Sequence, residues 1–366
     1  MAAIGRGRSK TQARRRHGDS LAWDLAPLVV LAGAGVALLQ PPDRRIGLGL
    51  GFERGRGRRA RSPGEIPKRG WKDILRRARS EFVEDQVPMV AAGVTFFTLL
   101  ALFPGVAVFV ALYGLFADIG EVQRHLHLLA FILPPAAVGL IGDEMIRIAA
   151  ASKGGQTLAF ALGLLASIWS ANGAVQALIT GLNVAYEEVE RRGPVKKRLV
   201  ALAFTLGLLA FAMAAVTLLA AQPAVEAFAG PRAATLFGWI CWPLLLVALT
   251  LGLALLYRFG PSRDPARWKW ISWGSAAVVI FWLAASALFS LYVSHFGHYD
   301  KTYGSLGAAV GFMMWIYLSV VVVLAGAELN AEIEHQTTVD TTVGAPMPMG
   351  LRRATMADTV GAAQGK

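Results

Sequence analysis

The stretch QTLAFALGLLASIWSANGAVQALITGLNVAYEE (156–188) decides the fold, because a long apolar helix runs directly into a series of polar residues. At 100° per residue these polar side chains share one face, within an arc of about 120°. They are Asn172, Gln176, Thr180, Asn183, Tyr186 and Glu187. A helix of this length and hydropathy is typical of a membrane span, in which a polar face must be kept away from lipid.

The composition places the chain among membrane proteins. Hydrophobic residues make up 55% of the 366 and charged residues 16%, and several uninterrupted apolar stretches exceed the ~18 residues of a spanning helix. We therefore predict an all-α, polytopic helical membrane protein. Its single cysteine, Cys241, excludes an intramolecular disulfide and a Cys-based metal site.

Six apolar stretches are strong enough to predict spanning helices. They cover residues 90–117, 157–182, 199–221, 236–257, 271–294 and 306–328. The loops 187–198 and 258–270 are rich in Lys and Arg, so the positive-inside rule puts both loops and both chain termini in the cytoplasm. The prediction is a six-helix transmembrane core within residues 71–335.

Residues 1–70 are predicted to be a basic cytoplasmic tail. The first 79 residues hold 19 of the 36 Lys and Arg, without the interleaved aromatics of a nucleic-acid module. Anionic phospholipid at the cytoplasmic face is therefore the expected partner, and nucleic acid is not. The apolar segment 21–39 within this tail is either an additional span or an interfacial or re-entrant segment. Residues 336–366 are predicted to be a disordered cytoplasmic tail.

Amphipathic helices are expected at the membrane surface on both sides. The segment WKDILRRARSEFVEDQV (71–87) combines an apolar face with three arginines elsewhere. The apolar face consists of Trp71, Ile74, Leu75, Ala78 and Phe82. After this helix the chain is expected to turn into the bilayer at Pro88. A second helix of this kind is predicted on the outer side, after residues 133–135.

The sixth span carries three glycines at one end and a carboxylate near the other. Gly304, Gly307 and Gly311 include two small residues four positions apart, which permit close helix packing in lipid. Glu328 either reaches the cytoplasmic water or faces the bundle, where it needs a partner from another helix. Asn330 lies on the opposite side of the same helix.

Three segments resemble a known family. They are AAGVTFFTLLALFPGVAVFV (91–110), NGAVQALITGLNVAYEEVERRGPVKKR (172–198) and YGSLGAAVGFMMWIYLSVVVVLAGAELNAEIE (303–334), and residues 70–335 are similar to the YihY/BrkB family of bacterial inner-membrane proteins. The resemblance implies a six-helix core in the bacterial inner membrane. Family members have been described as virulence or serum-resistance factors and as candidate transporters, and the family has carried the label ribonuclease BN. The first segment departs from the family at Phe97 and Ala101, where Tyr and often Ser are expected.

The residues do not support a nuclease, and neither an enzyme activity nor a cofactor is predicted. A metal-dependent RNA hydrolase needs clustered His and carboxylates, but the chain has six His in total and no such cluster in a predicted cytoplasmic loop. Glu332 and His335 have the spacing of a helical di-iron ligand pair, but no second pair completes the site. The histidines predicted on the outer side, His125, His127, His295 and His298, are interpreted as solvated loop residues.

The polar face leads to two functional hypotheses. In the first, it lines a polar cavity that opens to the cytoplasm and binds or transports an anionic solute or lipid. The cavity consists of Asn172, Gln176, Thr180, Asn183, Tyr186, Glu187, Glu328 and Asn330, and the anion is attracted by Arg191, Arg192, Lys196, Lys197 and Arg198. In the second, hydrogen bonds from this face only join helices of a non-transporting scaffold. The sequence has no Gly-x-x-x-x-Gly-Lys-Ser/Thr loop for nucleotides, and it leaves homo-oligomer formation open.

Overall fold

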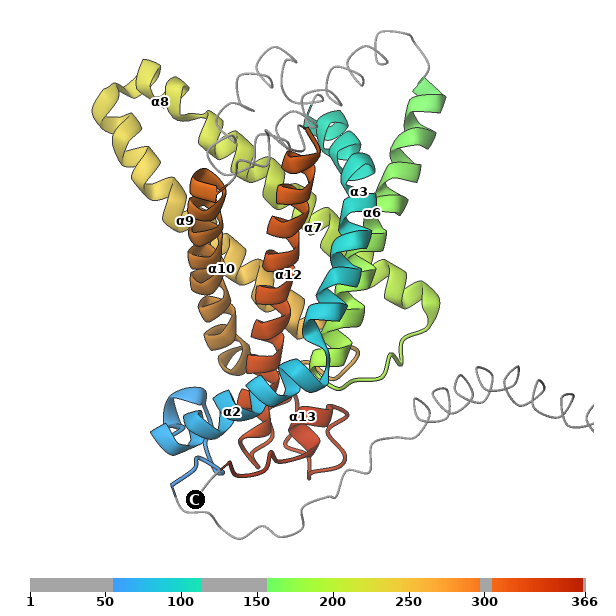
Figure 1. Ribbon diagram of the computed structural model, residues 1–366, viewed down its shortest axis with the longest axis vertical. Helices are drawn as coiled ribbons and strands as arrows, with labels where there is room; N and C mark the ends of the chain where they lie inside the picture. The colour runs from blue at the N-terminus through green and yellow to red at the C-terminus, as the bar shows by residue number, and fades with distance from the viewer. Residues whose placement is uncertain (1–54, 114–156, 297–304, 365–366) are drawn as a thin grey trace, which may run out of the picture. The chain divides into compact units, whose positions relative to one another are not determined.

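The computed structural model describes residues 55–113, 157–296 and 305–364, and within these ranges it contains helices and no β-strand (Figure 1). One isolated antiparallel bridge joins Ala266 to Thr342. The chain divides into two units, residues 1–50 and 51–366, and the description concerns the second. The predicted all-helical class is confirmed for the described residues. The segment 21–39, the second amphipathic helix and the side chains of the outer histidines lie outside them.

Each of the six predicted spans overlaps one long helix. These are α3 (Val87–Tyr113), α6 (Thr157–Ala185), α7 (Pro194–Ala220), α9 (Pro231–Phe259), α10 (Trp268–Phe296) and α12 (Ser305–His335). The shorter elements are the 3-10 turn η1 (Pro63–Glu65), α2 (Lys68–Glu84), α8 (Gln222–Ala229) and α13 (Thr355–Asp358). Prolines open α7 and α9, where their fixed φ suits the first turn and no hydrogen bond is lost.

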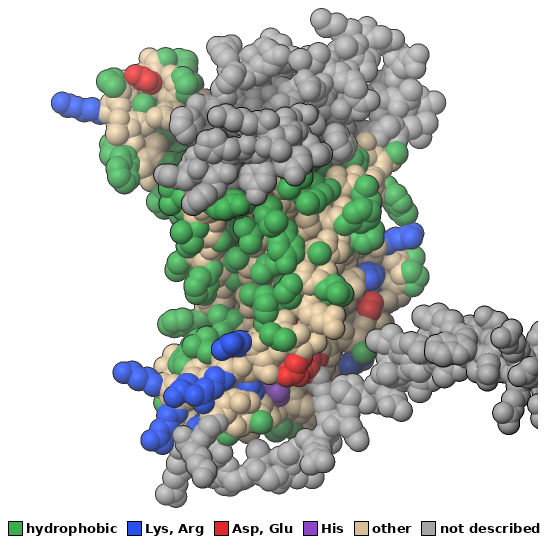
Figure 2. All heavy atoms as spheres, in the orientation of Figure 1, with side chains coloured by type: hydrophobic (Ala, Val, Ile, Leu, Met, Phe, Trp, Pro, Cys, Tyr) green, Lys and Arg blue, Asp and Glu red, His purple; other side chains and the backbone are tan. Residues whose placement is uncertain are grey.

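Four helical segments in the described part of the chain are long and apolar enough to cross a membrane. They are Pro194–Ala229, Pro231–Phe259, Trp268–Tyr292 and Ala309–His335, and a fifth results if α2 and the start of α3 count as one bent span. Figure 2 shows hydrophobic side chains in a broad band over the long helices. The protein is therefore a multi-pass helical membrane protein, with four or five spans by this criterion where six were predicted.

The last of the long helices, α12, is packed on several sides. It contacts α10, α3, α6 and α2, and it lies between α10 and α3 in Figure 1. Around it, α3 packs against α6, α6 against α7, and α9 against both α7 and α10. The core includes the buried side chains of Tyr186, Tyr257, Phe312 and Leu324. Polar residues on such an enclosed helix must find their partners within the protein.

A sharp break separates α2 from α3. The axes of the two helices differ by 61°, and Gln86 at the break has a φ of 51°, a conformation that is uncommon for a residue with a Cβ. The chain turns at residues 85–86, before the predicted Pro88. Pro88 already belongs to the first turn of α3, where a proline is tolerated because its missing N–H has no helical acceptor.

The buried face of α2 differs from the predicted apolar face. Ile74 is fully buried as expected, but Leu75 is 58% exposed and Arg77 only 4% exposed. The reason is a buried ion pair, because Arg77 Nε donates to the carboxylate of Glu332 on α12. A second bond runs from Arg77 Nη2 to Gln336 Oε1 at 2.7 Å. Apolar periodicity within α2 cannot reveal a partner so distant in the sequence.

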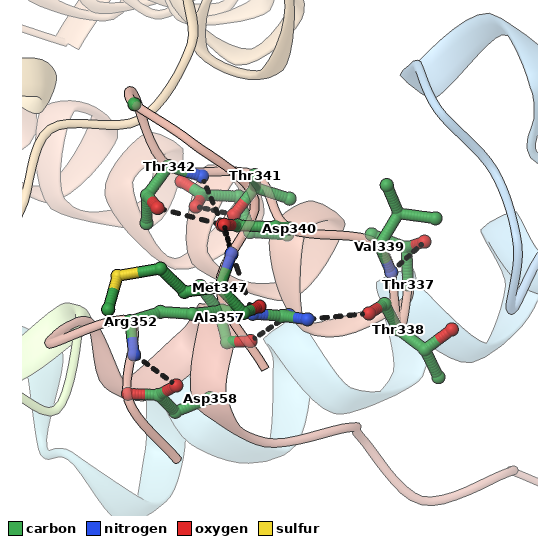
Figure 3. A network of polar contacts seen from close by, with 12 residues as sticks. Thr337, Thr338, Val339, Asp340, Thr341, Thr342, Met347, Arg352, Ala357 and Asp358 are labelled. Carbon is green, nitrogen blue, oxygen red and sulfur yellow. Dashed lines mark hydrogen bonds and ion pairs between the residues drawn. The ribbon is translucent and has the colours of Figure 1, made fainter. Parts of the chain in front are cut away.

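Residues 336–364 fold against the rest of their unit, which corrects the predicted disordered tail. Figure 3 shows the polar network within this segment, in which Asp340 Oδ1 accepts from Thr342 N at 2.9 Å and from Thr342 Oγ1 at 2.7 Å. Arg352 donates to three backbone carbonyl groups of the same segment. Thr337 Oγ1 anchors the segment to Ala60 O at 2.8 Å. The order comes from side-chain to backbone bonds, which a composition rich in Gly, Thr and Pro does not reveal.

The close approach of α10 and α12 occurs at two glycines that the sequence analysis did not select. A Cβ on Gly326 of α12 would collide with Val278 of α10, and a Cβ on Gly274 of α10 would collide with the amide of Asn330. Glycine therefore allows the two helices to meet at these points.

Among the three glycines predicted to pack in the sixth span, only one has described surroundings. Gly304 and the side-chain environment of residue 307 lie outside the described part of the chain. A Cβ on Gly311 would meet nothing within 4 Å. Close packing at positions 304 and 307 stays a prediction, and Gly311 has open space toward the described residues.

We expect Gly326→Ala to destabilise the protein relative to Gly311→Ala. Both substitutions bring the same gain in helix propensity, but the methyl group at 326 collides with Val278 while position 311 has free space. Overpacking of this kind costs about 1–3 kcal/mol. The measurement is the thermal unfolding midpoint of each purified variant in the same detergent. Equal midpoints would contradict the tight α10–α12 contact.

Candidate functional site

Most polar groups singled out in the sequence lie at one end of the helix bundle, here called the α2 end. It is formed by α2, the loops 186–193 and 260–267, the last turns of α12 and residues 336–364, and it is at the bottom of Figure 1. The polar face of α6 leads into this end. Its residues divide into those that join helices and those that meet in a buried cluster.

Asn172 joins α6 to α7. Its residue is 3% exposed, its Nδ2 donates to Arg198 O at 3.4 Å and its Oδ1 accepts from Thr205 Oγ1 at 3.5 Å. Both contacts are long for hydrogen bonds and therefore weak. They are nevertheless the interhelical contacts that a scaffold would use.

The next two polar residues of α6 lie nearer the surface. Gln176 is half-buried and Thr180 is exposed. Thr180 Oγ1 donates to Gln176 O at 2.9 Å within the helix and accepts from Lys197 Nζ at 3.3 Å. One of the predicted anion-attracting cations is thus bound to the polar face itself.

Asn183 connects the end of α6 to two loops. Its Oδ1 accepts from Ser262 N at 2.8 Å, and its Nδ2 donates to Glu190 Oε2 at 3.1 Å. The Ser262 hydroxyl accepts in turn from Arg191 N at 2.9 Å. The amide of Asn183 therefore holds the loop 186–193 against the loop 260–267.

Glu190 and Arg192 form an ion pair within the loop 186–193. Arg192 Nε and Nη2 donate to the two carboxylate oxygens at 2.7 and 2.9 Å, and Nη2 also donates to Gly260 O at 2.8 Å. Partial burial by itself raises the pKa of Glu190, but the hydrogen bonds from Arg192 outweigh it and lower the pKa to about 2. Arg192 is consequently engaged within the protein.

Other cations of the predicted anion-attracting loop remain at the surface. Lys196 and Arg198 are exposed at the start of α7, and the Arg198 guanidinium lies 4.8 Å from the ring centre of Trp169. The Arg191 side chain is 57% exposed, with its nearest carboxylate oxygen, on Glu188, at 3.8 Å. The loop therefore presents positive charge to solvent although Arg192 does not contribute.

Tyr186 is fully buried directly after α6. The guanidinium carbon of Arg263 lies 4.7 Å from the centre of its ring, a cation–π contact. Burial raises the pKa of Tyr186, so its hydroxyl keeps its proton. Among the described residues this hydroxyl has no hydrogen-bond partner of good geometry, although the Asn330 amide is close to it.

Arg263 and Glu334 form an ion pair whose two side chains are fully buried. Arg263 Nη2 donates to the two Glu334 oxygens at 2.7 and 2.8 Å, and Thr341 Oγ1 donates to Glu334 Oε2 at 2.9 Å. Burial alone lowers the pKa of Arg263, but the Glu334 carboxylate raises it above its usual value. The Nε and Nη1 groups of Arg263 lack a partner within the described residues.

Glu328 and Asn330 both face the interior, with exposures of 1% and 0%. The sequence left two positions open for Glu328, in contact with the cytoplasmic water or inside the bundle. In the structure its side chain lies inside the bundle. Oε1 of Glu328 and both amide atoms of Asn330 have no hydrogen-bond partner in the described ranges. Asp85, from the α2–α3 break, lies within hydrogen-bonding reach of Glu328.

These side chains form the buried polar cluster, which consists of Tyr186, Arg263, Glu328, Asn330 and Glu334. They come from the end of α6, the loop 260–267 and α12. Buried polar atoms nearly always have a partner in protein or ordered water, so several orphan atoms in one place call for an explanation. The donors of Tyr186, Arg263 and Asn330 and the acceptor of Glu328 can hold water or the polar group of a ligand.

The C-terminal segment covers the cluster. Met356 of α13 is buried in the same core as Tyr186. Thr355 N donates to Glu188 Oε1 at 2.6 Å, and Thr355 Oγ1 donates to the carbonyl oxygen of Glu187 at 3.1 Å. Burial raises the pKa of Glu188, which the bond from Thr355 partly offsets. Glu187, predicted at the cavity mouth, therefore meets the C-terminal segment.

The pairing of two arginines with α12 is not apparent from the sequence. Arg77 is one of the three arginines outside the predicted apolar face of α2, and Arg263 is one of the cations of the basic loop 258–270. The signal that could have found them is the pair Glu332 and Glu334 at the end of a span, because carboxylates there need cations if they are buried. The sequence does not show which cations of the neighbouring segments pair with these two carboxylates.

Comparison with known proteins identifies the family. Residues 78–348 match the family described as virulence factor BrkB. The chain belongs to the BrkB family. The resemblance seen in the three motifs is thereby confirmed, and this BrkB family chain contains its buried polar cluster within the matched region.

Curated relatives of this BrkB family chain come from several bacteria. A protein of Bacillus subtilis (strain 168) named as ribonuclease-like, YfkH, is 28% identical over 269 residues, which cover 70% of this chain and 94% of that protein. A UPF0761 membrane protein of Verminephrobacter eiseniae is 26% identical over 282 residues, 73% of this chain and 64% of the relative. Another UPF0761 membrane protein, from Aromatoleum aromaticum, is 28% identical over 277 residues, which cover 73% of this chain and 65% of the relative. No solved structure matches.

We expect the Glu190–Arg192 pair to stabilise the protein at neutral pH and to lose this effect in acid. The folded-state pKa is lowered to about 2 from an unfolded value near 4.3, so the contribution is full above about pH 4.5 and disappears as the pH falls toward 2. Its size is on the order of 1 kcal/mol, because solvent screening of this partly exposed pair reduces the ~1.4 kcal/mol per pKa unit.

The measurement is the unfolding free energy of the wild type and of Glu190→Gln in detergent, from neutral pH down to pH 2. The difference between them should shrink as the pH falls. Glu226→Gln serves as the control, because Glu226 is exposed and forms no ion pair with any described residue. A Glu190→Gln difference that stays constant over this range would show that the ion pair does not stabilise the fold.

Proposed function

We propose that this BrkB family protein spans the bacterial inner membrane six times, with both termini in the cytoplasm, and binds or transports an anionic solute or lipid through the polar interior of its bundle. The span count is supported by the six long helices, each of which overlaps a predicted apolar stretch. A cytoplasmic location of the α2 end is supported by the Lys and Arg side chains gathered there (Figure 2).

The observation that carries the binding proposal is the set of orphan donors in the buried polar cluster. The Tyr186 hydroxyl, Arg263 Nε and Nη1, and the Asn330 amide have no partner in the described part of the chain. Leaving a buried polar group unsatisfied costs about 1–3 kcal/mol. An anionic group bound among these donors would accept their hydrogen bonds and remove that cost.

The charges around the cluster indicate what kind of anion fits. Glu334 balances the charge of Arg263, so the ligand is held by directed N–H and O–H groups rather than by net positive charge. Exposed loop cations such as Lys196 and Arg198 supply attraction over longer distances. Glu328 Oε1, which also lacks a partner in the described residues, can accept a hydrogen bond from the ligand. A ligand that carries a hydroxyl group beside its anionic group therefore satisfies both sides of the cluster.

Access to the cluster involves the C-terminal segment. Met356 and the bonds of Thr355 to residues 187–188 cover the cluster at the α2 end. Exchange of a ligand with the cytoplasm consequently requires α13 to move. Thr355 makes both of the hydrogen bonds that join α13 to the loop 186–193.

A second candidate function is a non-transporting membrane scaffold. It is favoured by Asn172 and Asn183, whose amides bond to α7 and to the neighbouring loops. Bonds of this kind join helices without any ligand. The ribonuclease-like name is printed for YfkH and is said of that protein alone.

We expect Tyr186→Phe to weaken ligand binding without destabilising the fold. The substitution removes only a buried hydroxyl that has no partner in the described residues, so the free energy of unfolding stays equal or rises. The ligand loses one hydrogen bond and about tenfold in affinity. Binding is measured by titrating the purified protein with glycerol 3-phosphate and with dihexanoyl phosphatidylglycerol. These are a soluble and a lipid probe that share a phosphate beside hydroxyl groups.

Tyr257→Phe is the matched control. It also removes a buried tyrosine hydroxyl, but this hydroxyl donates to Val323 O at 2.8 Å, so stability should fall by about 1 kcal/mol while binding is unchanged. Equal binding by wild type and Tyr186→Phe, or no binding of either probe by wild type, would count against the proposal. Loss of folded protein in Asn172→Leu/Asn183→Leu, with no binding in wild type, would favour the scaffold.

A further inference from the structure

The outer face of α2 carries a groove that is separate from the buried polar cluster. The groove has a volume of about 460 Å³ and is lined by Lys68, Trp71, Lys72, Leu75, Arg76 and Arg79. Figure 2 shows Lys and Arg side chains gathered over α2, directly below the hydrophobic band. None of the lining residues belongs to the proposed cavity, so this groove is an independent site.

The four cations of the groove lie along one side of the helix. At 100° per residue they fall within an arc of about 80°, and they extend over roughly 17 Å of helix axis. All four are exposed, and within the described residues none of them pairs with a carboxylate. Arg76 Nη1 donates to one group, the backbone carbonyl oxygen of Gln364, at 3.0 Å. Their positive charge is therefore available to an external anion.

Two apolar residues lie beside this row of cations. Leu75 is 58% exposed and Trp71 is partly exposed. Contact with water does not stabilise an exposed leucine side chain. At a membrane surface this side chain inserts below the headgroups, while the neighbouring lysines and arginines stay at the level of the headgroups. Tryptophan is enriched at this boundary because its ring is apolar and its N–H is polar.

The opposite face of α2 fixes the orientation of the groove. Arg77 is bound to Glu332 of α12, and Asp73 accepts from Arg56 Nη1 at 2.7 Å. These buried contacts prevent rotation of the helix about its axis. The 61° break before α3 lays α2 across the end of that helix. The cations are thus held in place before any ligand arrives, which reduces the entropy lost on binding.

We propose that this groove binds the headgroups of anionic phospholipids in the membrane leaflet at the α2 end, with Leu75 and Trp71 at the boundary to the acyl chains. The occupant is a lipid rather than a soluble anion, because apolar residues lie beside the cations in the same groove and the groove adjoins the hydrophobic band. Zwitterionic lipids lack the net negative charge that four cations attract.

The test counts lipids bound to the full-length protein. The protein is placed in mixed micelles with equal amounts of phosphatidylglycerol and phosphatidylcholine, and retained lipids are identified by native mass spectrometry. Wild type should retain phosphatidylglycerol preferentially. Each cation near an anionic surface contributes about fivefold, so Lys72→Ala/Arg76→Ala/Arg79→Ala should reduce the preference by about a hundredfold.

Arg61→Ala/Lys269→Ala/Arg353→Ala is the matched control, because it removes the same charge from exposed positions outside α2. It should leave the preference unchanged. The single variant Lys72→Ala breaks no hydrogen bond to a described residue. Its preference for phosphatidylglycerol should fall about fivefold. This variant is used instead of the triple variant if the triple variant does not fold.

Three results would overturn the proposal. One is an equal loss of preference in the two triple variants, which would indicate net charge alone. Another is an unchanged preference in the α2 variants. The third is displacement of phosphatidylglycerol by inorganic phosphate but not by chloride at the same ionic strength, which would indicate a site for free phosphate. The proposed cavity is unaffected by any of these results, because Tyr186 and Arg263 are unchanged in every variant.

Discussion

Two buried carboxylates near the end of α12 organise the α2 end of the protein. Glu332 and Glu334 are almost completely buried, and a buried charge persists only where a partner satisfies it. Arg77 of α2 pairs with the first and Arg263 of the loop 260–267 with the second. Removal of either arginine would leave a buried charge uncompensated. The two pairs therefore hold α2 and the loop against a single helix, and through Gln336 and Thr341 they include the C-terminal segment.

The same two pairs create the features to which functions are assigned. Because Arg77 points inward to Glu332, the rest of α2 is rotated so that Lys72 and its neighbouring cations face outward beside the hydrophobic band. Because Arg263 is held by Glu334 through Nη2, its other N–H groups remain without a partner in the described residues, next to the ring of Tyr186. The two ion pairs thus determine both the position of the basic groove and the presence of the orphan donors. The same residues contribute to stability and to the proposed ligand binding. A variant that tests binding alone must therefore remove an orphan atom and leave the ion pairs intact.

Particular residues show how far the sequence could lead. Tyr186, Glu328 and Asn330 were selected from helical spacing and polarity, and all three are buried at the α2 end. Asn172 and Asn183 were selected in the same way but serve as links between helices and loops. Spacing along one helix identifies a polar face, but it does not say whether the facing atoms come from another helix, a loop or a ligand. The buried ion pair of Arg77 could not be predicted from the sequence, because 255 positions separate Arg77 from its partner Glu332.

The sequence by itself determined the helical membrane class, the family and the approximate positions of the long helices. Lipid cannot satisfy backbone polar groups, so apolar stretches of this length have one stable conformation, and that outcome is local. Only the tertiary structure decided which polar side chains are buried, which way α2 faces, and that residues 336–364 are ordered. Those outcomes depend on pairs of groups brought together from distant parts of the chain. The free energy of a buried charge is set by the partner it meets and not by its neighbours in sequence.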